Sequence, residues 1–374
     1  MEKINILFIQ ANTYASGYYR IGFIAEELKK DKRFRVDYYI HGQKADGFLY
    51  RMAAADIIVM QLQNSDLMAK GLPVIKANGI VIVMDMDDDL FSVPKWNPAY
   101  FGLGRNYIDK YNDMYGKKMD IAGNKKRLRN MRKILREVDL ITVTGSKIRD
   151  AYSRYNKVKI IPNLVDPARI KPAKRSGGFF DKHLRIFWQG SSTHIKDLEM
   201  LKPAVKHITE KYPHVRWFIW GSMYDNFAEN MEIHKDRVET KESVEMEDYY
   251  KNLKNIKMDI GICPLTTDDE EDKAYNECKS PIKFLEYSLC GIPSVVSDIS
   301  TYTDTVIPNH TALVARTTQD WIDHLSSLIE NPEDREILAQ NAKEQVLRDF
   351  NLQTKIKLWA DTFIKLHQDN PNKI

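Results

Sequence analysis

The sequence is poor in the residues that build disulfide frameworks or metal centres. Its 374 residues include three cysteines, Cys263, Cys278 and Cys290, without CxxC spacing, and no histidine pattern completes a metal site. Reduced thiols are the expected state of such a set in a cytoplasmic protein. We therefore expect neither a disulfide scaffold nor a bound metal.

Long apolar runs, repeats and low-complexity tracts are also missing. No run approaches the roughly 20 apolar residues that span a bilayer, and the opening MEKINILFIQ has no charged-then-apolar leader. Without a repeat of about 20–50 residues, solenoids and propellers are excluded. The composition, 43% hydrophobic and 29% charged, is that of a globular protein. We expect it in the cytoplasm, with the inner membrane surface as an alternative location.

Short, β-branched-rich apolar runs alternate with helical patterns along the chain. Runs of this kind, bounded by turn residues, are typical of buried parallel strands. The sequence therefore predicts an α/β protein of two Rossmann-like domains, whose parallel sheets face a central cleft with ligands at the carboxyl ends of the strands. The predicted strands are 4–9, 36–40, 57–60, 80–84, 140–143, 184–188, 215–220, 260–263 and 294–297, and the predicted helices include 21–30, 194–212, 246–255, 281–290 and 352–367.

One segment interrupts this alternation. Residues 168–183, ARIKPAKRSGGFFDKH, combine proline and glycine with basic residues and are predicted to link the domains. The first domain then comprises residues 1–167 and the second residues 184–349. The remaining residues, 350–374, form a C-terminal helix whose apolar face is expected to pack toward the first domain.

The most informative passage is 276–298, NECKSPIKFLEYSLCGIPSVVSD. Ser280 suits an N-cap, Pro281 the first helical position, and Gly291 the end of the helix. The free N–H groups and the positive dipole at the start of this helix suit an anionic phosphate. Glu286 shares a face with Lys283, and its carboxylate can accept two hydrogen bonds from a ribose diol.

A second passage, 186–198, IFWQGSSTHIKDL, has the features of a phosphate-binding turn. A strand leads to Gly190, where the backbone N–H groups can approach a phosphate, and then to Ser191. Lys196 adds a positive charge near a helix start. His194 is expected to cap the helix or to meet solvent. We therefore expect a diphosphate between the Gly190 turn and the helix that Ser280 opens.

The stretch KSPIKFLEYSLCGIPSVVSD resembles the donor-site signature of retaining GT-B glycosyltransferases, especially glycosyltransferase family 4. The resemblance implies metal-independent transfer from a nucleotide-sugar donor such as a UDP- or GDP-sugar, with Glu286 at the ribose and Gly190 and Lys196 at the diphosphate. No cofactor is implied. Where the family has its first glutamate this chain has Cys278, so Glu277, or Asn276 with Lys279, would contact the sugar. Where the family has an arginine after the glycine this chain has Ser191, so Lys283 or Lys279 would supply the second positive charge.

The first half contributes candidates for both the donor and the acceptor side. Gly17 lies in a turn between a strand and a helix and resembles the family's first-domain glycine loop, which implies that it faces the donor, whereas Arg20, which follows it, is a candidate for binding the acceptor. The acidic run 84–89, MDMDDD, follows a predicted strand where the family often has a histidine. Asp85 or Asp87 is expected to position the acceptor hydroxyl or to take its proton. The same letters form a DxD, which GT-A enzymes use to hold a metal, but a GT-A enzyme would not explain the second strand–helix series.

Positive charge and aromatic residues gather in one segment. Residues 105–137 hold 11 Lys and Arg against 4 Asp and Glu, whereas the net charge of the whole chain is only +4. Trp96 and Tyr100 just before it can stack on a sugar, as can Phe101, Tyr107, Tyr111 and Tyr115. The basic helix would attract a polyanionic glycan, a lipid-linked sugar at a membrane surface, or modified (hydroxymethylated) DNA, while a small-molecule acceptor or a merely solvated basic helix stays possible.

The sequence therefore predicts a hexosyl- or pentosyltransferase, and the resemblance implies that it acts with retention of configuration. Two alternatives remain: a nucleotide-sugar epimerase of the same two-domain build, and a non-catalytic sugar- or nucleic-acid-binding protein with a degenerate donor site. The oligomeric state, the sugar and the nucleobase are not predicted.

Overall fold

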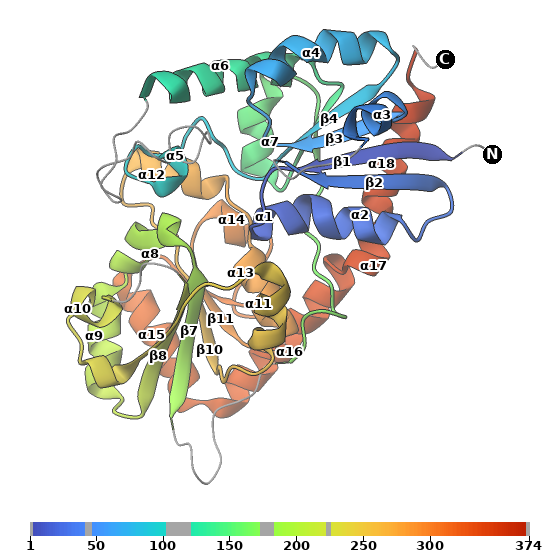
Figure 1. Cartoon of the computed structure of the whole chain (residues 1–374). Coiled ribbons are helices and arrows are strands. Elements are labelled where there is room, and N and C mark those ends of the chain that lie inside the picture. Colours follow the sequence, from blue (N-terminus) through green and yellow to red (C-terminus); the bar gives the residue numbers. More distant parts are fainter. Residues whose placement is uncertain (1–2, 42–46, 102–120, 173–182, 222–225, 372–374) are drawn as a thin grey trace. The chain divides into compact units, whose positions relative to one another are not determined.

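The computed structural model describes residues 3–41, 47–101, 121–172, 183–221 and 226–371. These residues form two compact units, Met1–Leu164 with Leu352–Ile374, and Val165–Asn351 (Figure 1). Each unit contains its own six-stranded sheet. The predicted α/β class with two Rossmann-like domains is confirmed. Most of the predicted linker, residues 173–182, lies outside the described residues.

The first sheet is parallel throughout, with the strand order β2-β1-β3-β4-β5-β6. The central strands β3 and β4 are buried along their whole length, because helices cover both faces. The short edge strand β6 was not predicted, since its residues are only partly buried and carry no apolar run. The strands are β1 Ile4–Gln10, β2 Phe34–Ile40, β3 Ile57–Gln61, β4 Val81–Met86, β5 Leu140–Val143 and β6 Val158–Ile160.

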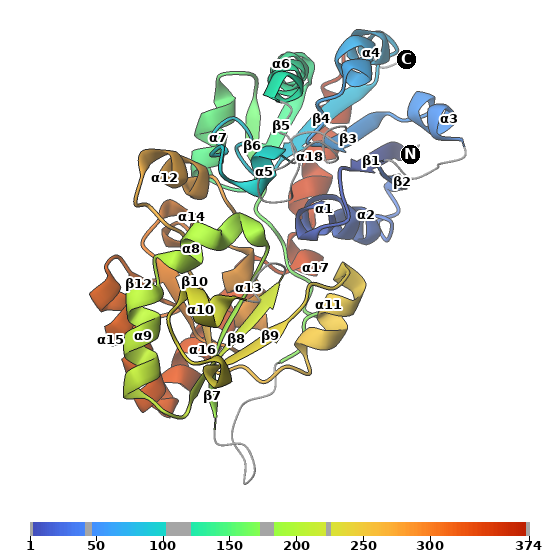
Figure 2. The ribbon, with the colours of Figure 1, turned by 60° about the vertical axis from the view of Figure 1, so that its left-hand side comes forward.

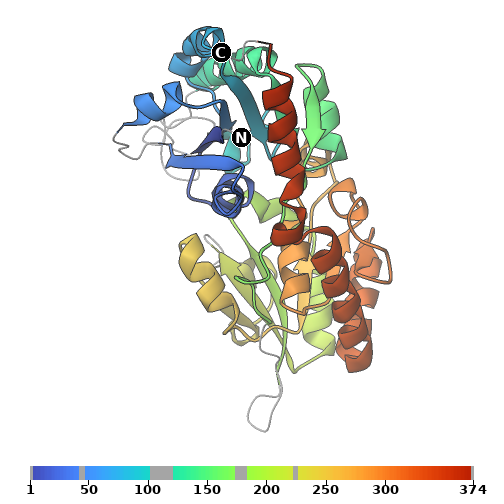
Figure 3. The same cartoon turned by 90° about the vertical axis from the view of Figure 1, so that its right-hand side faces the viewer.

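The C-terminal helices α17 and α18 belong to the first unit. Figure 3 shows α18 running along the sheet of that unit, where Phe363 meets Phe8 of β1 edge to face at 5.8 Å. The predicted helix 352–367 is interrupted at Ile356, between α17 and α18. The helical segments of this unit are α1 Ala15–Gly17, the π-turn η1 Tyr18–Gly22, α2 Phe23–Leu28, α3 Phe48–Ala53, α4 Asp66–Ala77, α5 Pro98–Phe101, α6 Ile121–Glu137, α7 Ser146–Ser153, α17 Leu352–Lys355 and α18 Lys357–Gln368.

The second sheet has the strand order of dinucleotide-binding domains. Its order is β12-β11-β10-β7-β8-β9, all parallel, so the chain starts in the middle at β7, runs to one edge and then returns to β10 for the other. The order reverses between β7 and β10, and ligands of open α/β sheets bind at such a point. The strands are β7 Leu184–Gly190, β8 Val215–Gly221, β9 Val238–Lys241, β10 Ile260–Cys263, β11 Ser294–Ser297 and β12 Leu313–Ala315.

Helices cover both faces of this sheet (Figures 1 and 2). On one face α9 and α15 pack on a core that includes Trp188, Trp217 and Trp321. The predicted helix 194–212 is wrong as one element, because it is broken around Leu201, and Pro203, which lacks an N–H, lies in the first turn of α9. The helical segments are η3 Ser192–His194, α8 Ile195–Glu199, α9 Lys202–Lys211, α10 Phe227–Asn230, η4 Lys235–Arg237, α11 Met246–Leu253, α12 Glu270–Glu277, α13 Ile282–Leu289, α14 Ser300–Thr303, α15 Thr318–Glu330 and α16 Pro332–Asp349.

The termini of α13 fix the position of the signature helix. Pro281 precedes the helix with a ψ of 31°, and no side chain caps the N-terminus, so the predicted Ser280 cap and Pro281 first turn are one residue early. At the other end Gly291 has a φ of +72°, as predicted for the stop. The N–H groups of Gly291 and Ile292 donate to the carbonyls of Ser288 and Tyr287, which completes a Schellman motif.

None of the helices in the described residues is both long enough and apolar enough to cross a bilayer.

Candidate functional site

The end of β7 is built for close approach of the backbone. A Cβ atom on Gly190 would lie 2.6 Å from the Trp188 ring and 3.2 Å from the His194 ring. Gly190 pairs with Gly221 at the end of β8, where a Cβ atom would lie 1.9 Å from the Gly190 carbonyl oxygen. The turn after β7 therefore requires glycine on both strands, and it lies at the point where the strand order reverses.

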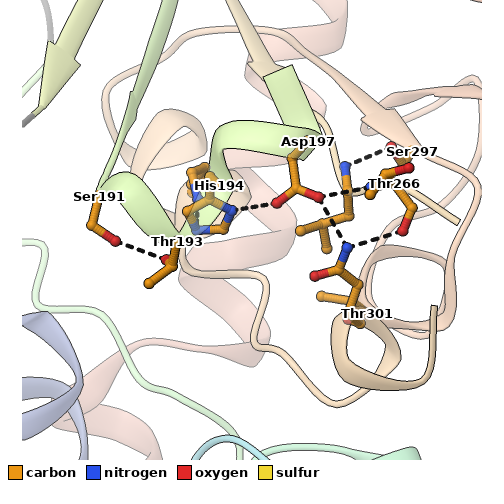
Figure 4. A network of polar contacts seen from close by, with 10 residues as sticks. Ser191, Thr193, His194, Asp197, Thr266, Ser297 and Thr301 are labelled. Atoms are coloured by element: carbon orange, nitrogen blue, oxygen red, sulfur yellow. Dashed lines mark hydrogen bonds and ion pairs between the residues drawn. The ribbon is translucent and has the colours of Figure 1, made fainter. Parts of the chain in front are cut away.

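A chain of polar contacts leads from this turn through His194 and Asp197 to Thr266 (Figure 4), and a contact of His194 with Lys283 joins it to the start of α13. Nζ of Lys283 lies 3.1 Å from Nε2 of His194, and Nδ1 of His194 lies 2.6 Å from Oδ2 of Asp197. The other oxygen of Asp197 accepts from the Thr266 N–H at 2.8 Å and from Nδ2 of Asn276 at 2.9 Å. The contacts join α8, the loop after β10, α12 and α13 into one site.

The charge states follow from this geometry. Burial, reinforced by the charges of Lys283 and Lys279, lowers the pKa of His194 to about 3, so the imidazole is neutral at pH 7. Burial opposes ionisation of Asp197, but the hydrogen bonds from His194 and from the Thr266 N–H, together with nearby positive charge, outweigh it and hold the pKa of Asp197 below its usual range. Neutral His194 thus donates from Nδ1 to the carboxylate and accepts at Nε2 from Lys283. His194 is an internal connector of the site rather than the predicted capping or surface residue.

Two cations gather beside the amino-terminal end of α13. Nζ of Lys279 lies 4.3 Å from the Tyr275 ring centroid, and Nζ of Lys283 lies 5.8 Å from that of Trp188. Burial, together with the nearby charge of Lys279, lowers the pKa of Lys283 to about 8. A like-charged pair next to unpaired helical N–H groups has the electrostatic character of an anion site.

Lys196 has a different environment from the predicted one. Its Nζ pairs with Asp272 at 2.7 Å and with Asp269 at 3.2 Å, both at the start of α12. The ammonium charge is therefore compensated by two carboxylates, of which Asp272 is only 2% exposed. Ser191 contacts the hydroxyl of Thr193 at 2.8 Å, within the same turn.

Glu286 is buried on α13, with an exposed fraction of 2%. Its Oε2 accepts hydrogen bonds from Nε2 of Gln189, at the end of β7, and from the Tyr249 hydroxyl at 2.8 Å. Residues 283 and 286 are one helical turn apart, so the cation of Lys283 and the carboxylate of Glu286 belong to neighbouring positions along one helix face.

The residues proposed for sugar contact lie at the end of α12. Glu277 is its last residue and is partly exposed, whereas Cys278 is 6% exposed and packs inward. Asn276 is 4% exposed, and its amide donates to Asp197 and to the Thr266 carbonyl. Of the residues predicted to contact the sugar, Glu277 and Lys279 are partly exposed and keep the exposure that this contact requires.

In the first unit, Arg20 and Asp85 are partners of each other. Both are fully buried, and the guanidinium makes two parallel bonds to the carboxylate, at 2.9 and 2.7 Å. The Thr142 hydroxyl donates to Asp85 at 2.6 Å, Arg20 also donates to the Ile161 carbonyl, and the Trp359 ring centroid lies 5.3 Å from its guanidinium carbon. With 0% exposure, neither side chain presents a polar atom to an acceptor molecule, in contrast to the expected acceptor-side roles.

Asp87, two residues beyond Asp85, differs from it because one of its carboxylate oxygens is not hydrogen-bonded. It is 7% exposed, and its buried Oδ1 has no hydrogen-bond partner. Burial, together with the charges of Asp88 and Asp85 and despite Arg20, raises the pKa of Asp87 to about 7. A carboxyl group of this kind at the end of a central strand is suited to proton transfer near neutral pH.

The contacts of the remaining candidates in the first unit are with neighbouring parts of that unit. A Cβ atom on Gly17 would lie 2.2 Å from the Asn12 carbonyl oxygen, so the glycine is required by its own loop. The Tyr100 carbonyl accepts from Nδ2 of Asn124 at 3.0 Å, which joins α5 to α6, and Trp96 is partly buried. Tyr107, Tyr111 and Tyr115 lie outside the described residues, as does the Phe101 side chain. The exposed cations of α6 are Lys125, Lys126, Arg129, Lys133 and Arg136.

Gln189, Asp197 and Tyr249 are among the site residues that were not predicted. Gln189 directly precedes the predicted Gly190, and Asp197 stands three residues after His194, so both had a local signal. Tyr249 reaches the site from α11, 37 residues before Glu286, and no local pattern marks it. No group of three or more His, Cys, Asp or Glu side chains in the described part of the chain could hold a metal ion.

Known structures share this fold over nearly the whole chain. Sucrose-phosphate synthase from Thermosynechococcus elongatus matches with a TM-score of 0.68 at 14% identity, covering 98% of this chain and 100% of that one. HepE from Anabaena, in complex with UDP and glucose, matches with a TM-score of 0.62 at 13% identity, covering 97% and 100%. A Listeria monocytogenes protein described as a UDP-N-acetylglucosamine 2-epimerase matches with a TM-score of 0.54 at 12% identity, covering 100% and 98%.

A family model matches most of the second unit and the first residues of the C-terminal helices that follow it. Residues 198–361 match the family described as glycosyl transferase-like, whereas no curated protein matches the sequence significantly. The matched region contains α13, the carboxylate of Glu286 and the cations of Lys279 and Lys283. The chain thus has the GT-B fold of known glycosyltransferases, and its second unit carries a glycosyl transferase-like domain.

Proposed function

We propose that this chain, a glycosyltransferase by fold and domain, moves a sugar from a nucleotide-diphosphate-sugar donor to a hydroxyl acceptor. One observation carries the proposal: Gly190, Lys283 and Glu286 come together where the strand order of the second sheet reverses. This is where a turn, a cation and a carboxylate can serve the diphosphate and the ribose of one nucleotide. The complex of HepE with UDP and glucose supports a UDP-sugar as the first donor to test.

In this proposal the diphosphate lies against the Gly190 turn and the start of α13. Lys283 and Lys279 supply the positive charge, and the N–H groups after Ser280 and Pro281 add the helix dipole. Ser191 offers a hydroxyl at the same turn. Lys196 takes part only if the phosphates draw it away from Asp269 and Asp272. Charge stabilisation of this kind lets a diphosphate leave without a metal.

For the chemistry we propose Asp87 as the residue that accepts the proton of the acceptor hydroxyl. Its raised pKa and its unpaired Oδ1 support this role. Asp85 then has a positioning role through its bond to Arg20, and Glu277 contacts the transferred sugar. The resemblance of residues 279–298 to retaining enzymes supports retention of the anomeric configuration.

On the acceptor side we propose that α6 attracts an anionic acceptor. Five exposed cations along this helix create a positive field, and Trp96 and Tyr100 precede it in the chain. A phosphorylated glycan, a lipid-linked sugar at the inner membrane surface and hydroxymethylated DNA share this chemistry.

The decisive experiment is a panel of nucleotide-sugars, incubated with and without acceptors, with products identified by NMR. Consumption of donor that depends on an acceptor and yields a product of unchanged anomeric configuration supports the proposal. Interconversion of the sugar without an acceptor would instead establish the epimerase, whose fold the Listeria protein shares. Failure to bind any nucleotide-sugar would establish the degenerate binding module.

A further inference from the structure

The carboxylate of Glu286 is held by two side chains from distant parts of the second unit. Nε2 of Gln189 and the hydroxyl of Tyr249 both reach Oε2, the second at 2.8 Å. The Tyr249 hydroxyl also contacts Oε1 of Gln189, so its single hydrogen lies between two acceptors. The three side chains form a closed triangle that joins β7, α11 and α13.

Two aromatic neighbours hold the tyrosine of the triangle in place. The Tyr249 ring packs on Trp220 with ring centroids 4.8 Å apart and against Tyr250 at 5.3 Å. Trp220 is itself fixed, because its indole N–H donates to the Glu242 carbonyl at 2.8 Å. Burial, with the neighbouring charge of Glu286, holds the pKa of Tyr249 well above its usual range, so the phenol remains a hydrogen-bond donor.

Both donor groups reach the same oxygen, Oε2, and so hold that side of the carboxylate in place. A carboxylate has acceptor sites for about four hydrogen bonds. Two donor groups that converge on Oε2 oppose rotation of the carboxylate toward a substitute partner. The site is also nearly closed to water, since Glu286 is 2% exposed, and hydrogen bonds gain strength in such surroundings. A site of this kind discriminates strongly against a ligand that lacks one of the expected hydroxyl groups.

We propose that Gln189 and Tyr249 orient Glu286 so that it requires both hydroxyl groups of the ribose, and that the protein therefore selects ribonucleotide donors over 2′-deoxyribonucleotide donors. This inference rests on the proposed function, in which Glu286 binds the ribose. Gln189 and Tyr249 are positioning residues. They act through Glu286, and the proposal assigns them a specificity that neither the fold nor the domain match contains.

The test compares the affinities of UDP and 2′-deoxy-UDP by calorimetry, with GDP and 2′-deoxy-GDP as a second pair. The native protein should bind the ribonucleotide about tenfold or more tightly. Tyr249→Phe removes only the hydroxyl. It should reduce this preference about fivefold, mainly by lowering the affinity for the ribonucleotide. Gln189→Met should act in the same direction. A matched control is Tyr212→Phe, which removes another tyrosine hydroxyl bonded to a carboxylate, that of Glu330, and should leave the preference unchanged.

Two results would overturn the inference. Equal affinity of the native protein for a ribonucleotide and its deoxy counterpart would show that no such selection exists. An equal loss of both affinities in Tyr249→Phe, with the preference intact, would reduce Tyr249 to a packing role. If none of the diphosphates binds, the proposed function itself fails, which is a different outcome from binding without preference.

Discussion

The ammonium group of Lys283 lies 3.1 Å from Nε2 of a histidine, His194, that stays neutral. Because His194 passes its own hydrogen to Asp197, it can only accept from Lys283. The lysine is therefore held at the start of α13 without a compensating negative partner in this contact. This arrangement makes an anion the natural ligand, and it connects the charge of the site to pH.

Binding of UDP should weaken as the pH rises through about 8. Burial lowers the pKa of Lys283 to about 8, so the ammonium loses its proton above that pH unless a phosphate holds it. Linkage then predicts about a tenfold loss of affinity between pH 7 and pH 9. Calorimetry across this range should show the loss, and Lys283→Arg, which stays charged, should abolish it. An unchanged affinity of the native protein up to pH 9 would remove Lys283 from the phosphate site.

Glu286→Ala should weaken nucleotide binding by about 1.5–3 kcal/mol, the value of a hydrogen bond to a charged group. Glu239→Ala is a suitable control, because this glutamate lies on β9 of the same sheet and pairs with Arg185. Calorimetry with UDP would measure both. An affinity equal to that of the native protein would exclude the ribose role of Glu286.

Asp85→Asn should destabilise the protein by about 3–5 kcal/mol, because it leaves the buried charge of Arg20 without its partner. The matched control is Asp37→Asn, which breaks the exposed pair with Arg51 and should cost less than about 1 kcal/mol. Urea denaturation followed by circular dichroism would measure the difference. A loss as small as the control's would mean that Asp85 is not a structural partner of Arg20.

Asp87→Asn should instead act on catalysis. If Asp87 is the general base, its loss should lower kcat by about 10²–10⁴-fold and leave the affinity for the donor unchanged. In the native enzyme kcat should rise with pH through about 7, where Asp87 ionises, and this limb should vanish in the variant.

Stability provides the control for Asp87. The folded protein keeps this proton up to about pH 7, whereas an unfolded aspartic acid releases it near pH 4. The free energy of unfolding of the native protein should therefore fall as the pH rises between these values. In Asp87→Asn this fall should be absent, because asparagine does not titrate. A variant as active as the native enzyme would assign the base to another group.

The sequence correctly predicts those features of the fold that depend on residues close to one another in the chain. The apolar runs place β5, β10 and β11 correctly, and Gly291 ends α13 through a backbone conformation that a single residue determines. Even the break before α9 had a local sign in Pro203. Such features depend on the period of the apolar residues and on turn chemistry, which are contained in a short window.

The sequence does not predict which charges meet. Lys196 pairs with Asp272, 76 residues further along, and Arg20 pairs with Asp85, 65 residues further along. Both cations were expected to face a ligand, because a charge beside a glycine turn has that appearance when its distant partner is unknown. The same distance hid Tyr249 from Glu286. The strand order brings these residues together, and only a folded chain shows the result.

Reversing charges on α6 should slow transfer to a polyanionic acceptor, while transfer to a small neutral acceptor should change little. Lys125, Arg129 and Lys133 are exposed at intervals of four residues and so share one helix face. Replacing all three by Glu should raise KM for a polyanion severalfold and flatten its dependence on salt, because fewer counterions are released on binding. Lys3, Lys32 and Lys235, also exposed, give the same change in net charge elsewhere and serve as the control. If the control substitutions slow transfer to the polyanion as much as the α6 substitutions do, the net charge of the protein rather than this helix attracts the acceptor. If neither set has an effect, the cations of α6 are solvated and bind no acceptor.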